Sequence, residues 1–527
     1  MIFESPYPEI EIPDRPLTDH VLRRAEERPD HPALIDGPSG RTLTYGQLAE
    51  AVRRAAAGLA ARGLRKGDAL AIYSPNLPEY AVAFHAVASI GGVVSTANPL
   101  YTAGELKSQL TDSRARFLIT VAPCLEKAAE AAEGTAVEEI FVFGEAPGAT
   151  PFSALLASGD APPEVEIDPA EDLVTRPYSS GTTGFPKGVM LTHRNLVANV
   201  EQMLAVDPDW RDEVLIGILP FFHIYGLTVL MNAALSEGAT LVTLPRFDLD
   251  GFLETLAKYR VTRAHLVPPI ILALAKHPAV DAHDLSALER IVSGAAPLSG
   301  ELAAACAERL GCHVGQGYGL TETSPVTHYA RVDDSVWCRA GTVGPPIPNT
   351  EVVIADLESG EALGPGERGE VRIRGPQVMR GYLGRPEETA ASIDEDGWFK
   401  TGDVGICDPE GRLRVVDRAK ELIKYKGFQV PPAELEAVLV ANPAIADAAV
   451  IPIPDPESGE APKAFVVARA PLDEQAVFDW VAERVAPYKK LRAVEFVDAI
   501  PRSAAGKILR RVLVEAERAK RAPPAAG

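Results

Sequence analysis

The chain has 527 residues, of which 46% are hydrophobic and 24% are charged, a composition typical of globular proteins rather than of disordered ones. This length is enough for roughly three or four average domains, or for one large domain with a small one. The formal net charge of −21 disfavours nucleic acid or an anionic membrane as the main partner.

The sequence predicts neither a membrane span nor a targeting signal. The nearest candidate for a span, at 81–95, is shorter than the roughly eighteen apolar residues required, and His85 interrupts it. The N-terminal MIFESPYPEIEIPD has acidic residues where a signal peptide has basic ones, and the C-terminal PPAAG is not a peroxisomal signal. We therefore expect a cytoplasmic protein with no membrane partner.

The cysteines are odd in number and scattered, and no two of them have C-x-x-C spacing. This pattern disfavours a disulfide framework or a zinc site and is typical of small apolar core residues. The five are Cys124, Cys306, Cys312, Cys338 and Cys407.

Predicted helices and strands alternate through the first part of the chain. Thr44 begins a Thr-x-x-Gln capping box, apolar residues then recur at helical spacing, and Gly63 ends that helix. Strands that alternate with such helices predict parallel sheets covered by helices. The further predicted elements are strands at 68–76, 93–99, 115–121, 171–179 and 313–319, and helices at 81–91, 105–113 and 301–311.

The pattern changes after 350. Short strands separated by Gly-, Pro- and Asp-rich turns, at 351–356, 369–375 and 411–417, predict a small β-barrel element. After 417 the sequence predicts a helix that begins at Pro431-Pro432, followed by strands at 447–455 and 463–471. The predicted fold is therefore α/β, with an N-terminal domain at 1–417 and a small α+β C-terminal domain at 418–527.

The loop YSSGTTGFPKGV, at 178–189, has the composition of an anion-binding site. Its glycines let the backbone approach an oxyanion, its hydroxyl groups donate hydrogen bonds, and Lys187 adds a positive charge. It is not a P-loop, because Gly188 rather than Ser or Thr follows Lys187. Taken alone, such a loop is more often a mobile turn.

The complete string resembles the phosphate-binding signature of the adenylate-forming (ANL) superfamily, which includes acyl- and aryl-CoA synthetases, firefly luciferase and the adenylation domains of peptide synthetases. The chain looks most like the bacterial type of the 4-coumarate/cinnamate:CoA ligase group. Further signatures occur in family order: LPFFHIYGL (219–227), SGAAPLS (293–299), QGYGLTETSPV (316–326), TGD (401–403), VDRAKELIKYKGFQVPPAELE (416–436) and PRSAAGKILRR (501–511).

The resemblance implies an acid–thiol ligase that uses ATP, Mg²⁺ and coenzyme A, and that forms an acyl-adenylate before the thioester. A carboxylate must then meet a negatively charged α-phosphate, which requires oriented donors and a cation. Thr321 would contact the α-phosphate and Glu322 would bind Mg²⁺. The residues implied to hold the β- and γ-phosphates are Ser179, Ser180, Gly181, Thr182, Thr183 and Lys187.

The resemblance also implies a nucleoside site, in which Tyr318 stacks on adenine and Asp403 and Arg418 bind the ribose. For Asp403 and Arg418 the alternative is a surface ion pair. Three further residues would line the adenine slot: Ala295, Gln316 and Gly317.

In this family the C-terminal domain rotates between two half-reactions, and Lys420 stands at the hinge position. Lys507 matches the lysine that bridges the substrate carboxylate and the α-phosphate. The basic stretches 418–427 and 488–511 agree with polyanionic ligands, although a solvated basic face is the alternative. The residues implied for thioester formation are Lys424, Lys426, Gly427 and Gln429.

The implied acyl pocket has flat or small side chains, which suits an aryl ring with a propenoate arm. His223 replaces the aspartate of amino-acid-activating relatives and disfavours an α-amino acid, although a lone histidine here is otherwise a core residue. Gly294 would leave room for a para substituent. Val229 stands where plant ligases carry serine, so we expect relaxed specificity. The pocket residues are His223, Tyr225, Val229, Gly294, Pro325 and Val326.

The expected function is a cinnamate/4-coumarate:CoA ligase, and a medium-chain fatty acyl-CoA ligase is the main alternative. A luciferase-like oxygenase and a non-catalytic binding protein are further alternatives. The binding protein is disfavoured because the lysines that the family chemistry needs are present: Lys187, Lys420, Lys424 and Lys507.

Overall fold

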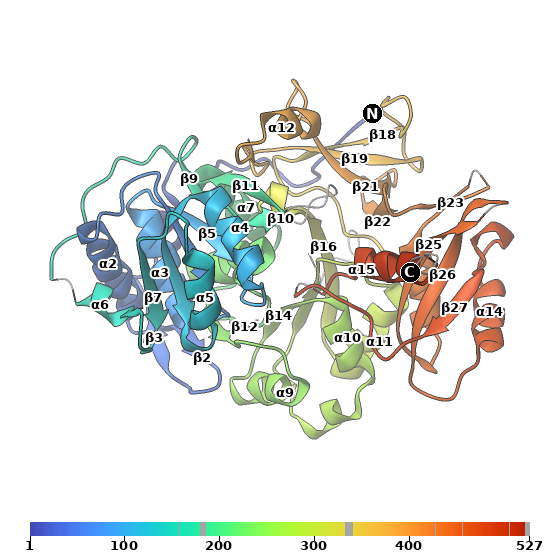
Figure 1. Cartoon of the computed structure of the whole chain (residues 1–527), viewed down its shortest axis with the longest axis horizontal. Helices are drawn as coiled ribbons and strands as arrows, with labels where there is room; N and C mark the ends of the chain where they lie inside the picture. Colours follow the sequence, from blue (N-terminus) through green and yellow to red (C-terminus); the bar gives the residue numbers. More distant parts are fainter. Residues whose placement is uncertain are drawn as a thin grey trace, which may run out of the picture.

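The computed structural model describes residues 1–157, 159–179, 186–331, 341–426, 428–455, 457–504 and 506–521. Two large sheets form the body of the molecule, a smaller antiparallel sheet lies beside them, and the C-terminal residues form a fourth sheet (Figure 1). Within the described part of the chain, no helix is both long enough and apolar enough to cross a bilayer.

The first large sheet is parallel at its centre. β9, β5, β4, β6, β7 and β8 run parallel, whereas β9, β10 and β20 are antiparallel to β11. The order is β10 (Tyr178–Ser179), β11 (Lys187–Thr192), β9 (Leu173–Thr175), β5 (Val93–Ala97), β4 (Ala69–Tyr73), β6 (Ala115–Val121), β7 (Glu139–Phe143) and β8 (Thr150–Pro151), with β20 (Gly381–Tyr382) paired to β11.

The second large sheet has a parallel core with an antiparallel strand at each edge. Its order is β17 (Val326–Tyr329), β16 (His313–Gly319), β15 (Arg290–Ser293), β14 (Arg263–Leu266), β12 (Val214–Gly217), β13 (Thr240–Thr243), β2 (Pro32–Asp36) and β3 (Thr42–Thr44).

Helices cover these sheets as the alternating pattern predicts. α3 contacts both β5 and β2 and so lies between the two sheets. The predicted capping box at α2 is present, since Thr44 accepts from the backbone of Gln47, whose side chain accepts from the backbone of Thr44. The helices are α1 (Leu17–Val21), α2 (Tyr45–Ala61), α3 (Pro78–Ser89), α4 (Ala103–Ser113), α5 (Leu125–Ala132), α6 (Ser153–Leu156), α7 (His193–Val206), α8 (Ala234–Glu237), α9 (Leu249–Lys258), α10 (Pro268–Lys276) and α11 (Gly300–Leu310). Shorter 3-10 turns are η1 (Ala122–Cys124), η3 (Pro278–Ala282) and η4 (Thr321–Thr323).

The small β-barrel element predicted after 350 is a five-stranded antiparallel sheet with β1 and β22 at its edges. The N-terminal strand β1 joins it, which the sequence pattern did not indicate. The order is β1 (Ile2–Glu4), β18 (Glu351–Ala355), β19 (Arg368–Arg374), β21 (Phe399–Cys407) and β22 (Leu413–Arg418), and α12 (Pro386–Ser392) lies beside it.

The C-terminal residues form an α+β unit with its own apolar clusters, separate from the main core. The predicted domain boundary falls at the end of β22, and the division into two domains stays a prediction. The elements are β23 (Ile423–Tyr425), β24 (Phe428–Val430), α13 (Pro432–Val440), β25 (Ile445–Asp455), β26 (Gly459–Ala468), α14 (Glu474–Ala482), η5 (Pro487–Lys489), β27 (Ala493–Phe496) and α15 (Arg510–Arg521).

One predicted strand is wrong in detail. The segment 171–179 forms two short strands, β9 and β10, because Pro177 has no N–H to donate to a ladder between them. Both strands pair with β11, and β10 and β11 place Ser179 opposite Lys187 across the signature loop. Residues 180–185 of that loop lie outside the described residues.

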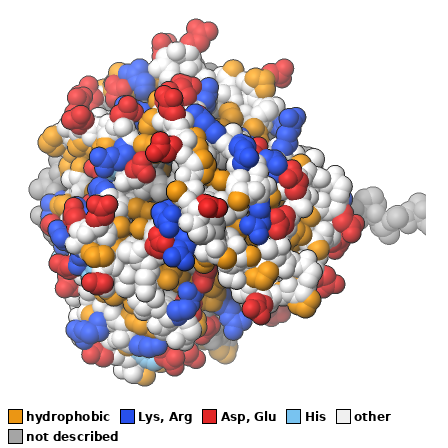
Figure 2. All heavy atoms as spheres, turned by 90° about the vertical axis from the view of Figure 1, so that its left-hand side faces the viewer, with side chains coloured by type: hydrophobic (Ala, Val, Ile, Leu, Met, Phe, Trp, Pro, Cys, Tyr) orange, Lys and Arg blue, Asp and Glu red, His pale blue; other side chains and the backbone are white. Residues whose placement is uncertain are grey.

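The prediction of free cysteines is confirmed for Cys124, Cys306, Cys312 and Cys407, of which Cys124 is only half-buried. Cys338 lies outside the described residues. On the face shown in Figure 2, acidic and basic side chains are intermixed, so the net negative charge is not gathered into one patch there.

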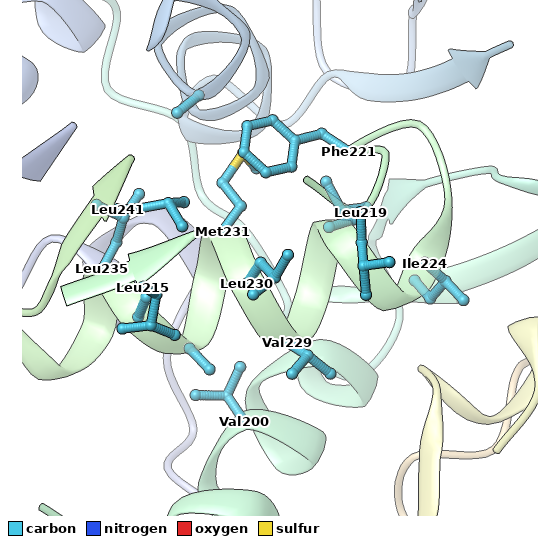
Figure 3. Close-up of a cluster of buried hydrophobic side chains, with 14 of the residues drawn as sticks. Val200, Leu215, Leu219, Phe221, Ile224, Val229, Leu230, Met231, Leu235 and Leu241 are labelled. Carbon is cyan, nitrogen blue, oxygen red and sulfur yellow. The ribbon is translucent and has the colours of Figure 1, made fainter. Parts of the chain in front are cut away.

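A nine-residue π-helix, η2 (Tyr225–Ala233), connects the core to the site. On one side of it Leu230 and Met231 pack with Phe221 in the apolar cluster of Figure 3, while Val229 lies on the other side, near Val200. π-Helical turns are rare and are often found at functional sites. The π-helix therefore holds Tyr225 and Val229 on a rigid support.

A buried ion cluster lies beneath the second sheet. The Arg263 side chain is fully buried and forms an ion pair with Asp207, whose side chain is 4% exposed. The Tyr329 hydroxyl donates to the same carboxylate at 2.6 Å, and the guanidinium lies 4.6 Å from the centre of the Trp210 ring. Each charge is thus paired and hydrogen-bonded, as buried charges require.

We predict that Asp207→Ala lowers the free energy of unfolding by about 3–5 kcal/mol, because it leaves the Arg263 charge buried without its main partner. Urea denaturation measures this loss. The matched control is Asp212→Ala, which removes an 85% exposed carboxylate from Arg28 and is expected to cost less than about 1 kcal/mol. Equal losses of unfolding free energy in the two variants would contradict the stabilising role assigned to the buried pair of Asp207 and Arg263.

Candidate active site

A cavity of about 560 Å³, including its solvent-open mouth, lies where β14, β15 and β16 end. The carboxyl ends of parallel strands are the usual place for ligand sites in α/β sheets. The cavity brings together most of the predicted pocket and nucleoside residues with a lysine from the C-terminal segment. Its lining includes His223, Tyr225, Val229, Gly294, Ala295, Gly317, Tyr318, Thr321, Pro325, Val326 and Lys507.

The signature segments enter the cavity from the ends of neighbouring strands. SGAAPLS begins in β15 and continues beyond it, and QGYG lies in β16, where Gln316 pairs in register with Ser293. Gln316 is half-buried but does not line the cavity. Ala295 has φ of +68°, a left-handed conformation that is uncommon for a residue with a Cβ and is often found at functional sites.

The structure corrects one expectation about Gly294. A Cβ added at this position would lie 2.6 Å from Cε1 of Tyr225, so the space that the glycine leaves is already filled by the tyrosine ring. Gly226 likewise permits a close approach of the backbone, since a Cβ added there would lie 2.2 Å from the carbonyl oxygen of Pro220. Gly294 therefore positions Tyr225 rather than leaving room for a substituent on the substrate.

Tyr318, Asp403 and Arg418 form a connected group at the mouth of the cavity. The Tyr318 hydroxyl donates to Oδ2 of Asp403 at 2.6 Å, and Nε of Arg418 lies 3.2 Å from Oδ1. The Asp403 side chain is 7% exposed and the Arg418 side chain is 34% exposed, so the carboxylate of this pair is buried while the guanidinium reaches solvent. Burial raises the pKa of Asp403, and the positive charge of Arg418 opposes that shift.

Glu322 lies beside Ser179, at the start of the signature loop. Its buried carboxylate accepts from the Ser179 hydroxyl at 2.9 Å and from the Tyr382 hydroxyl at 3.0 Å. Nζ of Lys187 lies 4.8 Å from the centre of the Tyr382 ring and forms an ion pair with Glu388 of α12. Ser179, Lys187 and Glu322 are therefore close together, whereas Ser180, Gly181, Thr182 and Thr183 lie outside the described residues.

Within the described ranges, no three His, Cys, Asp or Glu side chains cluster as the ligands of a metal ion would. A lone Glu322 still fits Mg²⁺, because this ion is commonly bound through one or two carboxylates together with the phosphates of its substrate. The hydrogen bonds from Ser179 and Tyr382 hold that carboxylate in place.

Lys507 and His223 both line the cavity, where His223 is half-buried and Lys507 is exposed at its mouth. Partial burial lowers the pKa of Lys507, and the charge of Arg418 lowers it further, whereas Asp403 and Glu322 oppose the shift. Burial and the charge of Lys507 lower the pKa of His223 to about 3, so this imidazole is neutral near pH 7. Its Nδ1 accepts from the Tyr225 backbone at 3.3 Å, which leaves the ring proton on Nε2.

The residues predicted for thioester formation are not in this cavity. Lys424, Lys426 and Gln429 are exposed on the β23–β24 hairpin, and Gly427 lies outside the described residues. Lys420 follows β22, at the connection to that hairpin. The structure thus brings Lys507 to the site, while the hairpin faces solvent.

Sequence reasoning missed several residues of the site. His265 and Tyr329 line the cavity, and Tyr382 and Glu388 contact the phosphate-loop residues. No motif surrounds these positions, and buried aromatic or histidine residues in a strand are ordinarily core residues. A signal available in the sequence was the presence of two polar residues, Arg263 and His265, in the otherwise apolar strand RAHL at 263–266.

The comparisons with known proteins agree with this geometry. The AMP-binding enzyme family matches residues 21–383, and the AMP-binding enzyme C-terminal domain matches residues 434–507. The chain belongs to the AMP-binding enzyme family. It is 44% identical to a 4-coumarate–CoA ligase of Pinus taeda over 97% of both chains. The structure of the anthranilate CoA ligase AuaEII with anthranoyl-AMP superposes with a TM-score of 0.88 at 25% identity, covering 96% of this chain and 98% of that one.

Two structures of a further relative also superpose. ATP-bound MatB from Rhodopseudomonas palustris superposes with a TM-score of 0.86, and apo MatB superposes with 0.77. Both comparisons have 31% identity and cover 95% of this chain and 99% of that one.

We predict that adenylate formation fails at alkaline pH with an apparent pKa below 10.5, the ordinary value for lysine. The pKa of Lys507 is lowered, so the ammonium form is lost at a lower pH than usual. The measurement is kcat/KM for ATP–pyrophosphate exchange against pH, which reports groups of the free enzyme. Cinnamate is the acid of choice, since it has no phenol that titrates.

Lys507→Arg provides the control, because a guanidinium stays charged throughout this range. For this variant, the decline of kcat/KM at alkaline pH should begin at a higher pH, even if the maximal rate is lower. A decline at the same pH as in the unmodified enzyme would show that a different group titrates.

Proposed function

We propose that the chain is an AMP-forming ligase that joins a cinnamate- or 4-coumarate-type acid to coenzyme A through an acyl-adenylate. The observation that carries this proposal is the position of Lys507, which shares one cavity with His223, Thr321 and the apolar residues around Tyr225. A cation and a neutral hydrogen-bond donor thus lie beside a largely apolar pocket. The enzyme would act in the cytoplasm, where ATP and coenzyme A are both present.

In the first half-reaction, a carboxylate oxygen of the acid attacks the α-phosphorus of ATP and pyrophosphate leaves. Lys507 offsets the repulsion between these anions, and Thr321 donates to the α-phosphate. His223 is neutral, so its Nε2–H orients the carboxylate by a hydrogen bond rather than by charge. Such donors act strongly in a cavity that excludes water.

Lys187 and Glu322 act at the other end of ATP. Lys187 would exchange its contact with Glu388 for the β- and γ-phosphates, together with the loop residues that follow Ser179. Mg²⁺ held by Glu322 would neutralise charge on the departing pyrophosphate. Asp403 would accept hydrogen bonds from the ribose hydroxyls, with Arg418 and Tyr318 holding its carboxylate in position.

In the second half-reaction, the thiol of coenzyme A loses its proton and attacks the adenylate carbonyl, and AMP leaves. Lys424, Lys426 and Gln429 would reach the site after rotation near Lys420, which removes Lys507. These three residues are exposed on the β23–β24 hairpin, which supports a surface that contacts the site only in the rotated arrangement of the C-terminal residues.

The acyl pocket and the relatives support an aryl acid. The pocket is lined by the rings of Tyr225 and Tyr329 and by small apolar side chains. The relative from Pinus taeda is named for 4-coumarate, and the AuaEII structure holds an anthranoyl adenylate. A medium-chain fatty acid would use the same machinery and is the second candidate.

The proposed substrate class predicts the outcome of an acid panel. With ATP, Mg²⁺ and coenzyme A, we expect kcat/KM for cinnamate or 4-coumarate to exceed that for octanoate by at least about ten-fold, because the flat pocket excludes a flexible chain from part of its volume. Formation of the thioester and of AMP is measured for each acid. Octanoate turnover above that of both aryl acids would reject the aryl class but keep the ligase chemistry.

A second prediction separates the two half-reactions. Lys507→Ala should reduce adenylate formation by on the order of 10²–10³-fold, since it removes a charge that acts on the transition state. Thioester formation from synthetic acyl-adenylate should remain within about three-fold of the unmodified enzyme, because Lys507 leaves the site in that step.

Lys520→Ala is the control for this experiment. Lys520 is an exposed lysine of the same segment that pairs with Glu495, and its loss should leave both half-reactions unchanged. If Lys507→Ala reduced both half-reactions equally, the proposal of two arrangements would be wrong.

A further inference from the structure

Helix α13 of the C-terminal α+β unit begins without a cap of its own. Its N-cap residue is Pro431, whose side chain accepts no hydrogen bond, and the next residue is Pro432. Prolines have no N–H group, so the first backbone donor of the helix is the N–H of Ala433. This group has no acceptor within the helix and needs one from elsewhere in the molecule.

Asp417 supplies this acceptor from the other side of the predicted hinge at Lys420. Its Oδ2 accepts from the N–H of Ala433 at 2.9 Å, and its Oδ1 accepts from the N–H of Arg418 at 2.8 Å. Asp417 lies in β22, where it pairs with Val404 of β21, and the residue is only 6% exposed. The carboxylate is thus fixed in the small antiparallel sheet while it caps a helix of the C-terminal unit, where a negative charge is favourable.

The opposite end of α13 also contacts the body of the molecule. Nζ of Lys276, in the last turn of α10, donates to the carbonyl oxygen of Val440 at 3.4 Å. Val440 is the last residue of α13, so a positive charge lies at the end of the helix where the helix dipole favours one. Residues that precede Lys420 in the chain therefore hold α13 at both of its ends.

A further set of contacts leads from α13 to Lys507. Glu436, in the middle of the helix, forms an ion pair with Arg510 at 2.6 Å and accepts from the N–H of Val450 at 2.8 Å. Arg510 is the first residue of α15 and follows Lys507 by three positions. Glu436 is buried and Arg510 is half-buried, so this pair is a firm link between the two helices. The direction of α13 relative to β22 therefore helps to set the position of Lys507.

We propose that Asp417 and Lys276 hold α13 at its two ends and thereby keep Lys507 at the cavity for adenylate formation. This inference rests on the proposed function. Both are positioning residues, since neither of them lines the cavity. Lys420 lies between Asp417 and Ala433 in the chain, so rotation there changes the geometry of the cap, and hydrogen bonds weaken steeply as they lose alignment. The two contacts favour the arrangement used in the first half-reaction over the rotated one.

Removal of the cap should affect the two half-reactions differently. In Asp417→Ala we expect kcat/KM for ATP–pyrophosphate exchange to fall by about three- to thirty-fold, which is the factor that loss of a helix cap corresponds to. Thioester formation from synthetic acyl-adenylate should stay within about two-fold of the unmodified enzyme or rise, because the rotated arrangement becomes more populated. A merely structural role would lower both rates together and leave their ratio unchanged, which would overturn the proposal.

Lys276→Ala tests the other end of the helix. Its side chain is exposed, so the variant is expected to fold. The ratio of exchange to thioester formation should fall by about two- to five-fold, a smaller effect than that of Asp417→Ala, because a charge at a helix end contributes less than a buried cap. If Asp417→Ala does not fold, this variant decides the question, and an unchanged ratio in Lys276→Ala would overturn the proposal.

Asp473→Ala is the matched control. Asp473 is the N-cap residue of α14, where its side chain accepts from the N–H of Ala476 at 2.8 Å. This cap has the same chemistry as that of Asp417, but both of its partners belong to the C-terminal unit, so its loss should leave the ratio unchanged. A ratio that fell as far in Asp473→Ala as in Asp417→Ala would overturn the proposal.

Failure of the proposed function would look different from failure of this inference. If the aryl class is wrong, the unmodified enzyme activates octanoate instead, and the same ratio is measured with that acid. If the ligase chemistry is wrong, the unmodified enzyme itself catalyses no ATP–pyrophosphate exchange with either acid, and the positioning role fails with it.

Discussion

Two anions must meet in the chemistry that this site supports, and the ammonium group of Lys507 is the part of the structure that makes this possible. The lysine comes from the C-terminal segment, yet it lies in a cavity formed by the ends of β14, β15 and β16. Partial burial and the charge of Arg418 lower its pKa, whereas Asp403 and Glu322 oppose that shift. An ammonium group placed beside two anions offsets their repulsion.

The surrounding structure keeps this cavity in shape. The π-helix η2 directs Tyr225 and Val229 toward the cavity, while Leu230 and Met231 anchor it in the core. The Asp207 carboxylate, which pairs with Arg263, accepts a hydrogen bond from the hydroxyl of Tyr329, and Tyr329 lines the cavity. The acyl side of the site is therefore built largely on strands and a buried helix, which favours precise positioning of a substrate.

Much of the site could be predicted from long motifs, because each motif fixes both the residue types and their place on a strand end. Tyr318, Thr321 and Lys507 occur in such motifs, and the structure brings them together. Two features could not be predicted this way. Gly294 was expected to leave room for substrate, yet Tyr225 fills that room, since a glycine does not indicate which neighbour approaches it. His265 stands outside every motif, and only the folded structure shows that it lines the cavity.

The sequence alone determined the class of fold and the activation chemistry. Alternating helices and strands specify parallel sheets through local periodicity, and the motif series specifies a reaction with ATP. Tertiary structure decided the rest, because it depends on distances between segments that are remote in the chain. It placed β1 beside β18, Ser179 beside Glu322 and Lys507 beside His223.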